Sequence, residues 1–173
     1  MTWITADTHF GHEKILTYCD RPFSSVEEMD EALISRWNAV VRKNDTIYHL
    51  GDFTLNKTAD EYLERLNGRI LFILGSHDYW LKKIDLNKYN KKLEILPLYK
   101  SIKVCGERVV LCHYPMASWE ASFYGSLHFH GHSHGDMPRI PNRFDVGVDC
   151  NDFYPFNLEW SVTLWAMNKS ITE

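Results

Sequence analysis

Short apolar runs separated by polar turns mark the first half of the chain, and three of them have the length and composition of β-strands. They cover residues 3–6, 46–50 and 70–74. The last run, Ile-Leu-Phe-Ile-Leu, has no polar position, which suits a strand buried on both faces. We therefore expect these strands to pair largely in parallel.

Helical spacing of apolar residues appears between the strands. Met29, Leu33 and Trp37 recur every four residues within a predicted helix over 27–41, and Ser24 or Ser25 is available as its N-cap. Residues 11–19 and 59–66 are also predicted to be helical. Strands that alternate with helices indicate an α/β fold, in which the helices cover a mostly parallel sheet.

The second half of the chain has a different pattern. A β-hairpin is predicted where two apolar segments, 100–104 and 108–112, flank a short turn. Further strands are predicted over 126–130 and 144–148. We therefore expect a second sheet. Residues 158–168 are predicted to form a terminal helix, with Glu159 in its first turn. The apolar residues near Trp160 leave a strand as the alternative for this segment.

Length and composition limit the class of protein. A chain of 173 residues that is 45% hydrophobic can fill one core, so we expect one globular domain over residues 1–173. The net charge of -4 disfavours a general nucleic-acid surface and suits small anionic substrates. No apolar stretch approaches the roughly 20 residues of a membrane helix, and no secretory leader is recognisable. The four cysteines are widely spaced, as expected of free thiols, so we expect a cytoplasmic protein with no membrane association.

Residues 82–92 carry five lysines and a single acid, Asp85. This charge run has two interpretations. It forms either an ordinary solvated face or a surface that steers an anionic substrate.

Candidate metal ligands follow the apolar runs directly. They are Asp7 and His9, Asp52, the Gly75-Ser76-His77-Asp78 turn, His113, and His132 and His134. Functional groups of open α/β sheets lie just beyond the carboxyl ends of the strands, so these side chains are expected to converge. Imidazoles and carboxylates from five segments predict a site for two divalent metal ions, because no single segment supplies enough ligands for both.

These motifs resemble those of the calcineurin-like metallophosphoesterases, which run Asp-x-His, Gly-Asp, Gly-Asn-His-Asp/Glu, His and Gly-His-x-His. The resemblance extends to Phe10-Gly11-His12, Arg21-Pro22-Phe23, His113-Tyr114-Pro115 and Val146-Gly147-Val148-Asp149, which are similar to the small single-domain bacterial and phage branch. It implies a four-layer sandwich of two mixed β-sheets flanked by helices, the metallo-dependent phosphatase-like fold.

The resemblance also implies a role for each residue. Asp7, His9 and His134 would hold the first metal, His113 and His132 the second, and Asp52 both. Ser76 stands where the family has an Asn ligand to the second metal. His77 would lie near the phosphate and be oriented by Asp78, while a hydroxide that bridges the metals attacks phosphorus. Manganese is the expected metal, and iron, zinc, cobalt or nickel also suit these ligands.

Other residues are candidates for substrate binding. His12 could line the cleft, whereas Arg21, Arg139 and Arg143 could grip phosphate or form ordinary surface pairs. The expected reaction is hydrolysis of phosphodiesters or phosphomonoesters, with a small phosphoester, a nucleotide or a nucleic-acid end as substrate. Nothing in the sequence indicates an oligomeric state.

Two alternatives to this reaction stay open. The serine hydroxyl reaches less far than an Asn amide, so the chain could be a metal-binding scaffold with impaired catalysis, whether Ser76 is native or engineered. An amidase-type metallohydrolase is a weaker alternative, because the ligand order is that of phosphoesterases.

Overall fold

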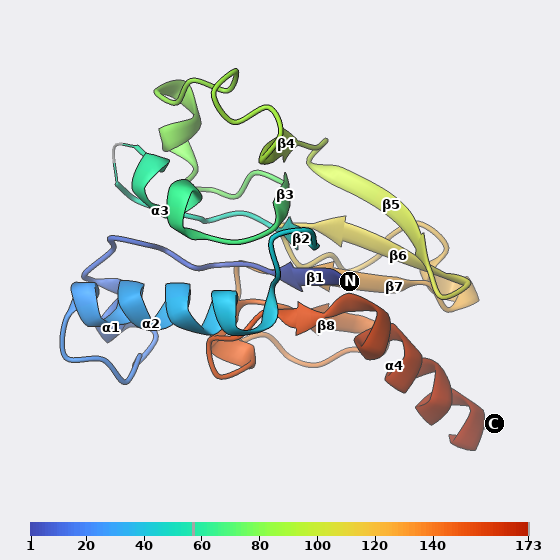
Figure 1. Ribbon diagram of the computed structural model, residues 1–173. Coiled ribbons are helices and arrows are strands. Elements are labelled where there is room, and N and C mark those ends of the chain that lie inside the picture. Colours follow the sequence, from blue (N-terminus) through green and yellow to red (C-terminus); the bar gives the residue numbers. More distant parts are fainter. Residues whose placement is uncertain (57, 173) are drawn as a thin grey trace.

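Two β-sheets form the centre of the molecule in the computed structural model, which describes residues 1–56 and 58–172 (Figure 1). The first sheet has the order β4 (Leu93–Ile95), β3 (Arg69–Phe72), β2 (Thr46–His49), β1 (Thr2–Thr5) and β9 (Phe156–Asn157). Its strands pair in parallel except for β9, which runs antiparallel to β1. This sheet is therefore mixed, with its antiparallel strand at one edge.

The second sheet has the order β5 (Tyr99–Val104), β6 (Glu107–Cys112), β7 (Leu127–His130) and β8 (Arg143–Asp145). β5 and β6 form the predicted antiparallel hairpin, whereas β7 pairs in parallel with both β6 and β8. The predicted α/β arrangement of two mixed sheets with flanking helices is confirmed.

Three helices pack against the first sheet and share an apolar core with it. They are α1 (Ile15–Tyr18), α2 (Val26–Val40) and α3 (Asp60–Arg65). Met29, Leu33 and Trp37 of α2 are buried in one apolar core with Ile47 of β2 and Ile70 of β3. These are the α2 positions whose spacing predicts the helix. Ser25 is the N-cap, because its side chain accepts a hydrogen bond of 3.2 Å from the backbone N–H of Glu28.

A second apolar core joins the two sheets. Ile4 of β1 packs there with Val109 and Leu111 of β6, and α4 (Leu158–Thr172) adds Leu158 and Val162. Successive side chains of a strand point to opposite faces, so β1 places Trp3 in the helix-covered core and Ile4 between the sheets. The strand β1 is thus anchored on both faces, which fixes the position of its carboxyl end.

Residues 113–126, which include the 3-10 helix η2 (Ser122–Tyr124), contact the outer face of the second sheet at β7. The ring of Trp119 lies 5.2 Å from that of His128 on β7, and the N–H of Met116 donates to Nε2 of His128 at 3.2 Å. His128 is fully buried beneath this segment.

Several elements differ in length from the predictions. The helix expected over 11–19 is limited to α1, because Gly11 has a φ of +69°, outside the helical region, and its N–H is held by the side chain of Asp30. The strand expected over 144–148 ends at Asp145, since the 3-10 helix η3 (Val148–Cys150) begins at Val148. The edge strands β4 and β9 and the 3-10 helix η1 (Tyr79–Lys82) were not predicted.

The segment beginning at residue 158 is the predicted helix, so its strand alternative is wrong. Within the described residues, no helix is long and apolar enough to span a bilayer.

Candidate metal centre

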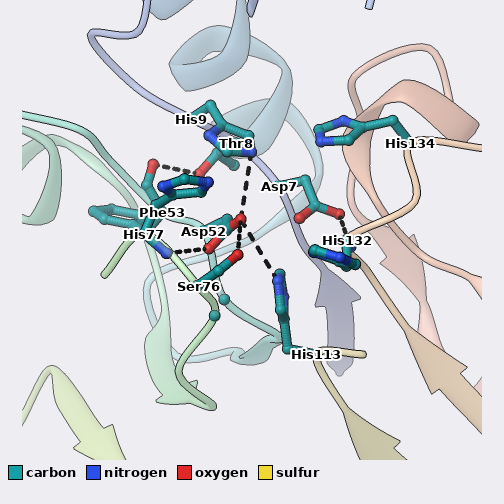
Figure 2. A network of polar contacts seen from close by, with 12 residues as sticks. Asp7, Thr8, His9, Asp52, Phe53, Ser76, His77, His113, His132 and His134 are labelled. Carbon is teal, nitrogen blue, oxygen red and sulfur yellow. Dashed lines mark hydrogen bonds and ion pairs between the residues drawn. The ribbon is translucent and has the colours of Figure 1, made fainter. Parts of the chain in front are cut away.

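The candidate ligands lie just after the carboxyl ends of strands from both sheets. Asp7 and His9 follow β1, Asp52 follows β2, Ser76 and His77 follow β3, His113 follows β6, and His132 and His134 follow β7. Figure 2 shows these side chains pointing toward one another from separate segments. The parallel pairing of β1 with β2, β2 with β3, and β6 with β7 brings their carboxyl ends together within each sheet.

A first ligand group consists of Asp7, His9 and His134, whose nitrogen and oxygen ligand atoms all lie within 4.8 Å of one another. Asp7 is fully buried and His9 nearly so. Among the described residues, Oδ1 of Asp7 and both ring nitrogens of His9 are buried without a hydrogen-bond partner. Buried polar atoms are normally paired, so this cluster of lone pairs fits a cation.

A second ligand group consists of Asp52, His113 and His132, with the same spacing of ligand atoms. Nδ1 of His113 lies 2.7 Å from the carbonyl oxygen of Leu50 and therefore carries the proton that it donates. Its Nε2 is then an acceptor, and within the described chain this buried atom has no hydrogen-bond partner. The second group therefore also presents a free imidazole lone pair, as a metal ligand does.

Asp52 connects the two groups. Its Oδ2 atom lies 3.7 Å from Nε2 of His9 and 3.5 Å from Nε2 of His113 (Figure 2). The other oxygen, Oδ1, accepts a hydrogen bond of 2.8 Å from the backbone N–H of His77, which fixes the carboxylate. One carboxylate oxygen thus stands between imidazoles of both groups, as a ligand shared by two cations requires.

Ser76 lies at the second ligand group. Its hydroxyl donates a hydrogen bond of 3.2 Å to Oδ2 of Asp52 (Figure 2). The position expected to carry an amide oxygen therefore presents a short, neutral hydroxyl.

The backbone of the centre is strained. Five candidate ligands have φ values in the left-handed region, namely Asp7 (57°), His9 (50°), Asp52 (55°), His132 (70°) and His134 (47°). Such conformations cost about 1–3 kcal/mol each for residues other than glycine, and they concentrate at functional sites. The fold therefore holds these side chains in place against a local conformational preference.

Glycines allow the carboxylates to approach the main chain. A Cβ atom on Gly75 would lie 2.3 Å from Oδ1 of Asp52, and one on Gly131 would lie 2.6 Å from Oδ2 of Asp7. Both contacts are too short for real atoms, so glycine in the third and fifth motifs makes room for the ligands.

Burial disfavours charge on the first ligand group. It raises the pKa of Asp7 to about 7 and lowers the pKa of His9 to about 2. Burial also acts to raise the pKa of Asp52, but the nearby imidazoles of His113 and His9 and the hydrogen bond from the N–H of His77 together outweigh it, and the net shift is downward. A divalent cation would favour the ionised carboxylate and the neutral imidazole that both groups need for binding.

Asp78 differs from its expected role. Its carboxylate accepts hydrogen bonds of 2.6–2.9 Å from the backbone N–H groups of Asp52, Phe53 and Gly75 and from Nε1 of Trp80. With two donors on each oxygen it has no capacity left to orient the His77 ring, and within the described chain no hydrogen bond joins the two side chains. Asp78 instead ties the Asp52 loop to the His77 loop.

A cleft of about 500 Å³ opens over both ligand groups. His77 and His12 line it, and their rings lie 5.9 Å and 5.5 Å from the ring of His9. Neither is in a ligand group, so both are available to a molecule that enters the cleft.

The sequence model of the calcineurin-like phosphoesterase superfamily domain matches residues 2–140, which include the segments of all five motifs. The chain belongs to this superfamily. The family implies divalent metals, and the two ligand groups are candidate sites for them.

Relatives of this calcineurin-like domain match it over nearly their whole length. An uncharacterized protein of Methanocaldococcus jannaschii is 38% identical, and the match covers 98% of this chain and 93% of that protein. The gene 66 protein of Mycobacterium phage L5 is 27% identical over 86% of each chain. The crystal structure of a protein of unknown function from Aquifex aeolicus has a TM-score of 0.71 and 26% identity, covering 95% of this chain and 98% of that one.

In this calcineurin-like domain, the three arginines considered as candidates to grip phosphate do not line the cleft. Arg21 is buried, and all of its donors bind protein atoms. The guanidinium of Arg143 donates to the carbonyl oxygens of Met116 and Pro138. Arg139 and Arg143 line a separate cavity of about 350 Å³. Arg21 and Arg143 thus have donors bound to protein atoms, which a sequence pattern does not show and which leaves the phosphate-gripping alternative without support for these two residues.

Sequence reasoning missed two residues of the centre. Lys14 lines the cleft over the ligand groups, although no motif marks it. Asp149 accepts a hydrogen bond of 2.7 Å from Nδ1 of His134. The Val-Gly-Val-Asp sequence that ends at Asp149 belongs to the family resemblance and could have drawn attention to this carboxylate.

Proposed function

We propose that this protein is a phosphoesterase that uses two divalent cations to hydrolyse phosphodiesters or phosphomonoesters. The observation that carries the proposal is the position of Oδ2 of Asp52 between imidazoles of the two ligand groups. Two cations about 4 Å apart polarise phosphoryl oxygens and activate a water molecule. Asp7, His9 and His134 would hold one cation, His113 and His132 the other, and Asp52 both, with manganese as the expected ion.

His77 and His12 would act on the substrate. Both line the cleft beside His9, and His77 is exposed to solvent, so an incoming phosphoester can reach its ring. We assign His77 the donation of a hydrogen bond or proton to the oxygen that leaves phosphorus. Lys14, which also lines the cleft, is assigned the phosphate-binding role for which the arginines were candidates.

The cleft favours small or terminal phosphoesters. Tyr18 lines it, and Tyr114, which is half exposed, packs its ring against those of His113 and His132. Exposed aromatic rings beside the ligand groups can stack on a nucleobase. We therefore propose a nucleotide, another small phosphoester or a nucleic-acid end as substrate.

Hydrolysis of bis-p-nitrophenyl phosphate and p-nitrophenyl phosphate with added Mn²⁺ tests the function. We expect His77→Ala to reduce kcat by about 10²–10⁴-fold while Mn²⁺ binding in calorimetric titration stays close to wild type. Asp52→Asn should abolish both activity and tight binding. A wild-type protein that hydrolyses neither ester with any of Mn²⁺, Fe²⁺, Zn²⁺, Co²⁺ and Ni²⁺ would overturn the proposal.

Ser76 favours one second candidate, a metal-binding scaffold with impaired catalysis. Its hydroxyl is a poorer ligand than an amide oxygen and is already hydrogen-bonded to Asp52. Turnover of the diester by wild-type protein, lost in His77→Ala, excludes the scaffold. Turnover that appears only in Ser76→Asn supports it.

We also propose a cytoplasmic location. All four cysteines are free in the structure, which suits a reducing compartment. Fractionation of cells that express the protein, with a periplasmic marker as control, tests this location.

A further inference from the structure

The side chain of Arg21 is buried beside the first ligand group, with all of its donors paired. Nε and one terminal nitrogen donate to the two carboxylate oxygens of Asp149, each at 2.8 Å. The same terminal nitrogen donates to the carbonyl oxygen of Asp7 at 2.7 Å. The other donates to the carbonyl oxygen of Thr8 at 2.9 Å and to Sδ of Met29 at 3.3 Å. These contacts use the five N–H groups of a guanidinium.

Asp149 has a second partner in addition to Arg21. Its Oδ2 atom accepts a hydrogen bond of 2.7 Å from Nδ1 of His134. With the proton on Nδ1, the lone pair of His134 is on Nε2, the nitrogen that remains for a metal. Metal-binding histidines commonly donate their other N–H to a carboxylate, which fixes the tautomer and the orientation of the ring.

A single guanidinium therefore reaches every member of the first ligand group. It binds the main chain of Asp7 directly, and it binds the carbonyl of Thr8, the residue before His9. It contacts His134 through Asp149. Asp7 and His9 have φ values of 57° and 50°, which residues other than glycine rarely adopt. Contacts such as those of Arg21 are therefore needed to hold the backbone of this segment in its conformation.

We propose that Arg21 and Asp149 are positioning residues that hold Asp7, His9 and His134 in the arrangement that binds the first cation. This inference rests on the proposed function, because it assumes that the first ligand group holds a metal. The pair touches neither the cleft nor the substrate. It acts through the ligands alone.

An alternative interpretation of the residues around Asp149 is a separate site for a metal that binds a thiol. Sγ of Cys19 lies within 4.8 Å of ligand atoms of His134 and Asp149. Arg21 argues against that reading, because both oxygens of Asp149 already bind its guanidinium. A metal there would have to displace a buried two-pronged ion pair and would stand next to an arginine charge.

Calorimetric titration of the whole protein with Mn²⁺ tests the positioning role. Arg21→Lys keeps the charge but loses the fork of donors, and Asp149→Asn keeps the shape but loses the charge. We expect each to weaken the first site by 10–100-fold, with a smaller change at the second site. The matched control is Arg65→Lys, because Arg65 forms a similar two-pronged pair with Glu31 on the exposed surface. This control should bind Mn²⁺ as wild type does.

A spectroscopic signature separates positioning from a purely structural role. In the Zn²⁺-loaded protein, the Nδ1 proton of His134 should give a downfield ¹H NMR resonance because it is donated to a carboxylate. That resonance should move upfield in Asp149→Asn and stay in place in Arg65→Lys. A merely structural pair would change thermal stability and leave the resonance and the first-site affinity unchanged.

The possible failures are distinguishable. If wild type binds two cations and the Arg21 and Asp149 variants bind them equally well, the positioning role is overturned and the proposed function stands. If wild type binds no cation, both are overturned. Should either single variant not fold, Arg21→Met combined with Asp149→Asn removes both buried charges, and the same loss at the first site is expected.

Discussion

The hydroxyl of Ser76 donates a 3.2 Å hydrogen bond to Oδ2 of Asp52, the oxygen that stands between the two ligand groups. The serine therefore engages the shared carboxylate oxygen without adding a strong ligand of its own. A neutral hydroxyl is a weaker donor of electron density to a hard cation than an amide oxygen. The second ligand group is thus the weaker half of the proposed centre.

Ser76→Asn should strengthen the second site. The longer amide can place its oxygen beside His113 and His132, so we expect about tenfold tighter Mn²⁺ binding there, equivalent to about 1.4 kcal/mol. Calorimetric titration measures it, with Ser118→Asn, a substitution of an exposed serine away from the ligands, as the control. Equal second-site affinity in Ser76→Asn and wild type would show that the serine does not limit binding.

Asp78→Asn should destabilise the protein even though Asp78 touches no substrate. Replacing one carboxylate oxygen by an NH₂ group leaves two of the four buried donors around it without an acceptor. Hydrogen bonds to a charged group are worth about 1.5–3 kcal/mol each, so we expect a loss of at least about 2 kcal/mol in urea unfolding. Asp85→Asn is the control, because the side chain of exposed Asp85 accepts only from the N–H of Asn87 among the described residues. Similar losses in both variants would contradict this role.

Removal of cations should lower the melting temperature. The buried, unpaired lone pairs of Asp7, His9 and His113 gain partners only when a cation binds. Mn²⁺ at 100 times its Kd stabilises the folded state by about 2.7 kcal/mol, and each kcal/mol corresponds to about 2–4 °C in a chain of this size. We therefore expect EDTA to lower the Tm by about 5–10 °C in scanning calorimetry. Asp52→Asn, which lacks the shared ligand, should respond much less, and an equal response would argue that the cation binds elsewhere.

The candidate metal centre could be predicted from the sequence because its ligands lie directly after the carboxyl ends of predicted strands. Asp7, Asp52 and His113 each come after an apolar run, and the carboxyl ends of parallel strands lie together. The roles of Asp78 and Arg21 could not be anticipated in this way. Asp78 is next to His77 in sequence, yet its carboxylate is fully used by other donors. Arg21 is polar, yet partners from distant segments allow its burial.

Some elements of the fold, too, could not be predicted because they depend on partners that are distant in the sequence. The strong apolar runs predict the central strands, whereas β9 has only two residues and forms by pairing with β1. Such a strand is defined by its neighbour and leaves no periodic pattern in the sequence. The helix after β1 is shorter than predicted because Gly11 and Asp30 fix a turn there.

His49 provides a prediction about acid stability. It is fully buried on β2, where its Nδ1 accepts from the N–H of Gly51 at 3.2 Å and its Nε2 lies 3.1 Å from Oγ1 of Thr8. The Thr8 hydroxyl donates to the carbonyl of Phe53, so it must accept from His49, and the ring is held neutral. Burial lowers the pKa of His49 to about 3.

His49→Phe should therefore make the protein less sensitive to acid. The folded-state pKa lies below the ordinary value of 6.5, so the unfolded chain binds a proton first and stability falls as pH drops from about 6.5 to about 3. This loss is about 2 kcal/mol between pH 8 and pH 5. We expect the variant to be less stable at pH 8, because Gly51 and Thr8 lose their partner, but to lose about 2 kcal/mol less than wild type on acidification. Urea unfolding of both proteins in EDTA at pH 8 and pH 5 measures the difference. An identical pH dependence would mean that His49 is already protonated in the folded protein at pH 5.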